Sequence, residues 1–218
     1  MTTNKKIDTA LRYNKAQKLN KNFMYQDLKR SNCYNSDFSN SNFNFTSLRG
    51  AQFKSCNFYG CTFKSAELVA TNLKKTKFAK AKFENAVFEA CNLEGADFSG
   101  ATFKNTIFLN TDISKALNLN IKESEVKIFD EMPTVEMSER LENSINLAMK
   151  NQYVKKSRTL DTKDGGINNI SVIILLENFK EKQLIEGFTL LSERMDKEFC
   201  TLSYIIKTLQ GYKAQGLL

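Results

Sequence analysis

The chain has 218 residues, a net charge of +8, five cysteines and no histidine. The missing histidine excludes every histidine-containing catalytic triad and removes the commonest general base. The first 21 residues are polar and basic, and no apolar run approaches the length of a membrane span, so we expect a soluble cytoplasmic protein with reduced cysteines.

Residues 1–20 are the first predicted element, an N-terminal cap. Within residues 4–19, Ile7, Ala10, Leu11 and Leu19 approximate one face of a helix among basic residues. We expect this helix to cover the open edge of the element that follows.

From residue 23 to residue 113 an apolar residue recurs at every fifth position. This period fits neither an α-helix nor a flat strand and requires a regular turn every five residues. The twelve phenylalanines of the series form the predicted core. The series is Phe23, Leu28, Cys33, Phe38, Phe43, Leu48, Phe53, Phe58, Phe63, Leu68, Leu73, Phe78, Phe83, Phe88, Leu93, Phe98, Phe103, Phe108 and Ile113.

Small residues stand two positions before most of these apolar centres, as at Ala51, Cys56 and Thr71. Side chains at these two positions share one face of an extended backbone, so both point inward. The residue between them is mostly Asn or Asp and faces solvent. The second residue after the centre is sometimes glycine, which suits a tight corner.

Segments such as Ala96-Asp97-Phe98-Ser99-Gly100 and Cys91-Asn92-Leu93-Glu94-Gly95 resemble the repeat unit of the pentapeptide-repeat family. The resemblance implies a right-handed, square-sectioned parallel β-helix with four pentapeptides per coil. We therefore expect a mainly β protein with a solenoid of nearly five coils over residues 21–121.

Four repeats per coil place residues twenty apart on one face of the solenoid. The four faces are named here by their inward centres. They are face one (Phe23, Phe43, Phe63, Phe83, Phe103), face two (Leu28, Leu48, Leu68, Phe88, Phe108), face three (Cys33, Phe53, Leu73, Leu93, Ile113) and face four (Phe38, Phe58, Phe78, Phe98).

Two groups of outward residues are candidate contact surfaces. The basic belt runs round the middle of the solenoid and could meet phosphates or an acidic partner. The apolar patch lies on face two, and we expect the C-terminal module or a second protomer to dock there. The basic belt is Lys54, Lys74, Lys75, Lys77, Lys80 and Lys82, and the apolar patch is Val69, Val87, Ala90, Ile107 and Leu109.

Beyond the repeats, Leu117, Leu119 and Ile121 predict a closing strand. Residues 122–133 are charged, contain the only proline and are interpreted as a linker. Residues 134–218 form a mainly helical module with helices over 135–156, 183–195 and 197–212 and a loop over 161–169. The apolar run 170–176 fits a strand or a helix equally well.

The sequence offers no catalytic, metal-binding or cofactor-binding residues. The inward cysteines are typical of packing, and zinc sites usually need close pairs and histidine. We therefore expect a protein that is not an enzyme and binds no cofactor.

Two classes of function remain open, with a weaker third. The first is a scaffold that presents flat faces to a protein partner, with the C-terminal helices available for dimerisation. The second, implied by the family resemblance, is binding of a type II DNA topoisomerase such as gyrase, with protection from quinolones. That branch relies on an acidic surface, whereas residues 21–116 carry 13 basic and 8 acidic side chains. The third is direct polyanion binding.

Overall fold

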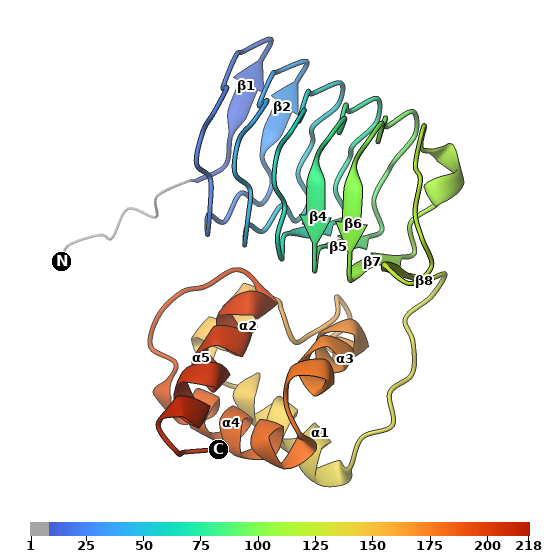
Figure 1. The fold of residues 1–218 in the computed structure, drawn as a ribbon. Coiled ribbons are helices and arrows are strands. Elements are labelled where there is room, and N and C mark those ends of the chain that lie inside the picture. Colours follow the sequence, from blue (N-terminus) through green and yellow to red (C-terminus); the bar gives the residue numbers. More distant parts are fainter. Residues whose placement is uncertain (1–8) are drawn as a thin grey trace, which may run out of the picture. The chain divides into compact units, whose positions relative to one another are not determined.

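The computed structural model describes residues 9–218, which divide at Asp130 into two compact units. The first unit contains all the strands and the second contains all the α-helices (Figure 1). Within residues 9–218, no helix combines the length and the apolar character that crossing a membrane requires. Each unit is described by itself below.

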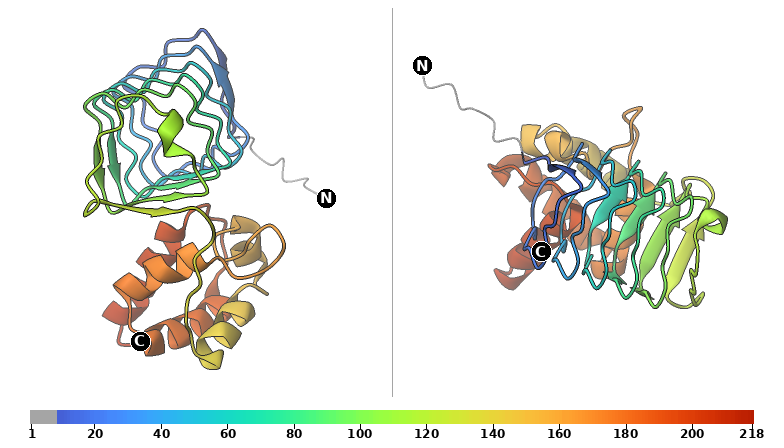
Figure 2. Two further views of the ribbon diagram at one scale, coloured as in Figure 1. Left: turned by 90° about the vertical axis from the view of Figure 1, so that its right-hand side faces the viewer. Right: turned by 90° about the horizontal axis from the view of Figure 1, so that it is seen from above.

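The first unit is a parallel β-solenoid of about six turns, four-sided when seen along its axis (Figure 2). Every strand pair and almost every bridge joins residues twenty positions apart, so one coil takes twenty residues. Strands β1 (Arg12–Asn14) and β2 (Asn32–Tyr34) pair on face three, and β4 (Lys82–Glu84) and β6 (Thr102–Lys104) pair on face one. On face two the order is β3 (Glu67–Val69), β5 (Val87–Glu89), β7 (Thr106–Leu109) and β8 (Val126–Phe129). The predicted parallel solenoid with a helical C-terminal part is confirmed.

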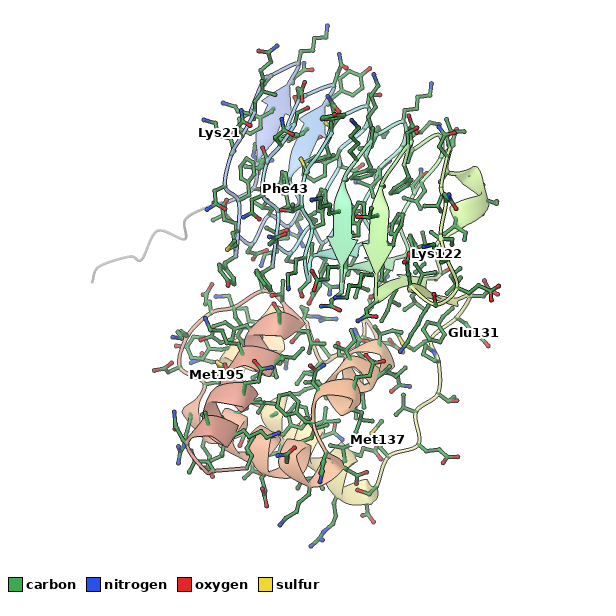
Figure 3. All side chains as sticks on the ribbon, viewed as in Figure 1. Lys21, Phe43, Lys122, Glu131, Met137 and Met195 are labelled. Carbon is green, nitrogen blue, oxygen red and sulfur yellow. The ribbon has the colours of Figure 1, made fainter. Side chains whose placement is uncertain are left out.

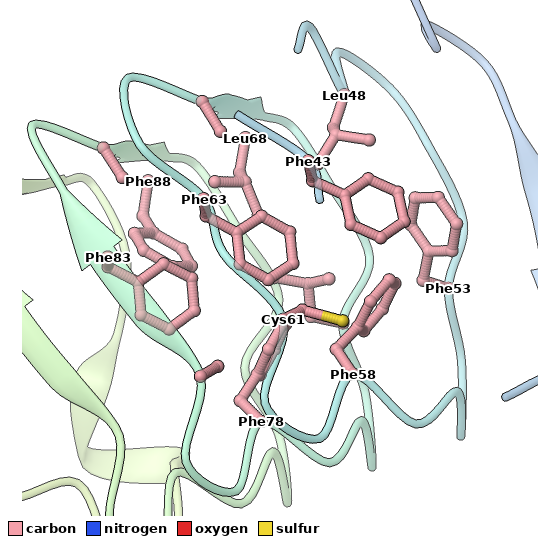
Figure 4. Close-up of a cluster of buried hydrophobic side chains, with 14 of the residues drawn as sticks. Phe43, Leu48, Phe53, Phe58, Cys61, Phe63, Leu68, Phe78, Phe83 and Phe88 are labelled. Atoms are coloured by element: carbon pink, nitrogen blue, oxygen red, sulfur yellow. The ribbon is translucent and has the colours of Figure 1, made fainter. Parts of the chain in front are cut away.

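Phenylalanine centres form two long parallel stacks inside the solenoid, on faces one and four (Figure 4). On face four the rings of Phe38, Phe58 and Phe78 lie parallel, with centroids 5.1 and 5.4 Å apart. Between the stacks, Phe58 meets Phe43 and Phe63 edge to face at 5.3 and 5.6 Å. Parallel stacking along the axis and edge-to-face contact across it are both favourable ring geometries.

The polar side chains of the repeat form hydrogen bonds with the backbone. The carboxylate of Asp97 accepts hydrogen bonds from the backbone N–H and hydroxyl of Ser99 at 3.0 and 2.6 Å, and Asn57 accepts from the N–H of Tyr59. Inward hydroxyls and thiols donate to the preceding coil, as Thr76 does to the carbonyl of Phe53 at 2.8 Å. The Asn or Asp before each centre therefore caps the turn that follows it, beyond merely facing solvent.

The predicted N-terminal helix is wrong over residues 9–19, the part of it that the structure describes. Residues 9–20 form the first coil, in which β1 pairs with β2 and Gln17 bridges to Asp37; residues 4–8 lie outside the described part. Leu11 takes the inward small position and Tyr13 the centre, so the repeat begins two units earlier than predicted. The lysine at the next centre, Lys18, hides this register in the sequence.

The other end of the solenoid also differs from the prediction. Leu117 forms one bridge to Asp97, and residues 118–121 form no strand. A short 3₁₀-helix, η1 (Ile113–Lys115), precedes them, and β8 lies inside the stretch assigned to a linker. Val126 is buried and β8 pairs with β7 in the same twenty-residue register. Polar residues at the intervening centres conceal this coil, which brings the solenoid from nearly five turns to about six.

The second unit contains five helices: α1 (Glu139–Ala148), α2 (Gln152–Ser157), α3 (Asn169–Asn178), α4 (Glu181–Arg194) and α5 (Leu202–Ala214). The stretch 135–156 is not one helix, because Asn151 ends the turn after α1 and its side chain caps α2. The apolar run 170–176 is helical and belongs to α3. The helix expected from residue 197 starts five residues later, at Leu202.

The helical unit has its own core. Leu141, Val172, Leu184, Phe188 and Ile205 are among its fully buried side chains. Helices α4 and α5 come close at a glycine, because a Cβ at Gly187 would lie 2.5 Å from Cδ2 of Leu209. Figure 3 shows the side chains of both units, with Phe43 labelled inside the solenoid and Met137 and Met195 in the helical unit.

Four of the five cysteines should be chemically silent in the native protein. Burial raises the pKa of Cys33 to about 11 and the pKa values of Cys56, Cys61 and Cys91 to about 12. We expect Ellman's reagent to modify only the half-buried Cys200 in native protein and all five thiols in urea. Reaction of any thiol in native Cys200→Ser protein would contradict this burial.

The same thiols predict a loss of stability at high pH. Because their pKa values are higher in the folded chain, the folded state holds these protons more tightly than the unfolded state does. The effect on stability is absent below about pH 8 and grows as pH rises through the unfolded value of 9.0 toward 11 and 12. Urea unfolding at increasing pH measures it, and Cys56→Ala should flatten the dependence.

Candidate interaction surface

The interior of the solenoid is solid. The side chains of Phe38, Phe43, Phe53 and Phe63 are 0% exposed, and neighbouring rings in each stack are in contact. Such an interior leaves no space for a ligand between the coils. Anything that the solenoid binds must therefore contact its outer faces.

The lysines of the basic belt are spread over two neighbouring coils and three faces and do not form one patch. Lys54 and Lys74 stand twenty residues apart on face three, and Lys75 occupies the corner to face four. Lys77 is on face four and Lys80 on its far corner, whereas Lys82 lies on face one in β4. Faces three and four, which adjoin, together hold five of the six lysines.

Some of this positive charge is balanced within the solenoid. The Nζ atom of Lys74 lies 2.8 Å from Oε2 of Glu94, one coil further on. Lys77 stands next to Asp97 in its column. The pKa of Asp97 is lowered, mainly because Asn118 and Ser99 donate hydrogen bonds to its carboxylate, and the charge of Lys77 adds to this effect. The belt is therefore weaker as a polyanion site than its six lysines suggest.

Two exposed tyrosines lie among these lysines. Tyr34 on face three is 51% exposed and Tyr59 on face four is 39% exposed. The ammonium of Lys80 lies 5.5 Å from the centre of the Tyr59 ring. Tyrosine is a frequent anchor in protein interfaces, so these two residues make the surface more similar to a protein interface than lysines alone would. Their positions just after a repeat centre identify them as outward aromatics in the sequence.

Most of the apolar patch is not exposed. Val69, Val87, Ile107 and Leu109 are 7%, 8%, 4% and 2% exposed, and only Ala90 is open to solvent. Val87 of β5 pairs in register with Ile107 of β7. Docking of the C-terminal module or a second protomer on this patch stays a prediction.

The carboxylates of the solenoid serve the fold. Asp37, Asp97 and Asp112 each accept hydrogen bonds from a serine two residues later. Within residues 9–218, no three Cys, Asp or Glu side chains gather as a metal site requires.

These features define a parallel β-solenoid built from five-residue repeats. Residues 36–119 match the family model described as pentapeptide repeat region, which confirms the resemblance noted from the sequence. A search of curated proteins gives no match.

Solved structures with the same type of repeat are similar at low identity. Full-length QnrB1, a plasmid-mediated fluoroquinolone resistance protein, is 26% identical over 46% of this chain and 57% of its own, with a TM-score of 0.33. A pentapeptide repeat protein from the Arabidopsis thaliana thylakoid lumen is 15% identical over 68% and 80%, with a TM-score of 0.35. Rfr23 from the cyanobacterium Cyanothece 51142 is 16% identical over 53% and 87%, with a TM-score of 0.34. The match thus spans little more than half of QnrB1, and such TM-scores establish no shared function.

Proposed function

We propose that this protein is a non-catalytic scaffold that binds an acidic protein surface through faces three and four of its solenoid. The solid interior carries the proposal, because it leaves only the outer faces for binding. Faces three and four combine five belt lysines with Tyr34 and Tyr59, the composition that favours contact with an acidic protein. Its buried thiols suit a reducing compartment, so we place it in the cytoplasm.

Site-specific photo-crosslinking tests this function. A photoreactive phenylalanine analogue at Tyr59 should give one defined protein adduct in the expressing cell, whereas the same analogue at Asn44 on face one should give none. Lys77→Glu together with Lys80→Glu should reduce the Tyr59 adduct at least tenfold, because it reverses charge beside the contact. Equal adducts from both positions would refute the assignment of the face.

The parent chain and its Lys77→Glu, Lys80→Glu variant also test the alternative of direct polyanion binding. The purified chain should not retard duplex DNA or RNA in a gel at physiological salt, since Lys74 and Lys77 have acidic neighbours in their columns. If the parent chain retards nucleic acid and the Lys77→Glu, Lys80→Glu protein does not, the partner is a nucleic acid and not a protein.

Binding of a type II topoisomerase by mimicry of DNA has less support, because duplex DNA is acidic and faces three and four are basic. A gyrase supercoiling assay tests it directly. We expect neither inhibition of supercoiling nor protection from a quinolone.

A further inference from the structure

Helix α5 presents two different stripes within the helical unit. Its core stripe is apolar and buried, and consists of Leu202, Ile205 and Leu209. A second stripe, formed by Tyr204, Thr208, Gly211 and Gln215, follows the same helical spacing but is polar. This second stripe lines a cavity of about 290 Å³ whose opposite wall is the C-terminal end of α4 and the loop after it.

Gly211 keeps this cavity open. A Cβ at this position would have no atom within 4 Å, in contrast to Gly187, where it would collide with Leu209. Glycine inside a helix costs about 1 kcal/mol relative to alanine. No close packing explains the glycine at residue 211, so its effect is to leave space above α5.

Cations and hydroxyl groups surround this space. Arg194 at the end of α4 and Lys197 in the following loop contribute two positive charges, against the single lining carboxylate of Asp196. Among residues 9–218, Arg194 makes no ion pair or side-chain hydrogen bond. Its guanidinium is therefore available to an anion, which it binds best in a two-pronged geometry with a carboxylate.

Two tyrosines, Tyr204 and Tyr212, contribute hydroxyl groups to the cavity lining. Phe199 stacks on the Tyr204 ring at 5.0 Å and Lys197 lies 5.9 Å above it, which fixes this ring at the cavity wall. Burial raises the pKa of Tyr212, so its hydroxyl stays protonated at neutral pH. The rings and the thioether of Met195 supply apolar wall beside these polar groups.

We propose that this cavity binds a small carboxylate that carries an aromatic or other apolar part. The carboxylate pairs with Arg194 and Lys197 and accepts a hydrogen bond from Tyr212, while the apolar part lies over Gly211. The volume is close to the lower end of small-molecule sites, about 300–1,000 Å³. A bare inorganic anion would leave the apolar wall without a partner, which is why a carboxylate with an apolar part fits better.

Fluorine NMR of the full chain tests the proposal, with 3-fluorotyrosine at its seven tyrosines and benzoate as the probe. Benzoate should shift the resonances of Tyr204 and Tyr212 with saturation and leave the solenoid tyrosines unchanged. Benzamide, its neutral analogue, and inorganic phosphate should each bind at least tenfold more weakly. Equal affinity for either of them, or no saturable shift with benzoate, would overturn the proposal.

Three variants separate binding from folding. Arg194→Gln should weaken benzoate binding at least tenfold with an unchanged circular dichroism spectrum, because Arg194 is exposed. Gly211→Leu should abolish binding by filling the cavity while it keeps or raises helical stability. Lys213→Gln, on the same helix but outside the cavity lining, is the control and should bind as the parent does. The same loss in Lys213→Gln as in Arg194→Gln would show non-specific attraction and contradict the site.

Discussion

Phe58→Ala should lower the free energy of unfolding by about 3–5 kcal/mol, the usual cost of emptying a buried phenylalanine site. The Phe58 ring is 1% exposed and contacts five other phenylalanine rings, two by stacking and three edge to face. Because the coils above and below are fixed by continuous backbone ladders, the solenoid cannot collapse into the space. Urea unfolding followed by circular dichroism gives the measurement.

Phe45→Ala is the matched control for this change. Phe45 is an outward corner residue with φ of +58°, and its ring stacks on Tyr25 at 4.9 Å without entering the core. We expect this substitution to cost less than about 1 kcal/mol, since it removes a partly exposed contact. Equal losses in the two variants would show that the ring stacks do not carry the stability of the solenoid.

Val87→Asp and Ile107→Asp should each destabilise the protein by about 3–5 kcal/mol, because each places a carboxylate where a buried apolar side chain now lies. Face two already shows this effect, since burial raises the pKa of Glu89 in the same strand as Val87. A second acid beside Glu89 therefore meets both desolvation and like charge.

Thr102→Asp provides the comparison for these two variants. Thr102 occupies the same repeat position before its centre, but on face one, where it is exposed. Its replacement should change the free energy of unfolding by no more than about 0.5 kcal/mol. If Val87→Asp is as mild as Thr102→Asp, Val87 is open to solvent and the apolar patch is a free interface after all.

The candidate surface was only partly predictable. Each lysine of the basic belt can be placed on a face from its number alone, because side chains twenty residues apart align. The pairing of Lys74 with Glu94 follows from the same rule, yet whether the two atoms meet depends on rotamers that the rule does not specify. The cavity of the helical unit was not predictable, because it requires the packing of α4 against α5 and not the pattern of either helix.

The sequence by itself determined the solenoid, its twenty-residue coil and its phenylalanine core, since each five-residue repeat dictates the same local turn and inward side chain. It did not reveal the terminal coils, where Lys18 and Asn118 occupy centres that the repeat would make apolar. There the tertiary structure decided, because Val126–Phe129 pairs with the finished ladder of β7 through its backbone and buries only Val126 of its four side chains. The exposure of Val87 and Ile107 was also decided by the tertiary structure. The repeat register predicts that a side chain points outward, and only the folded chain determines whether water reaches it.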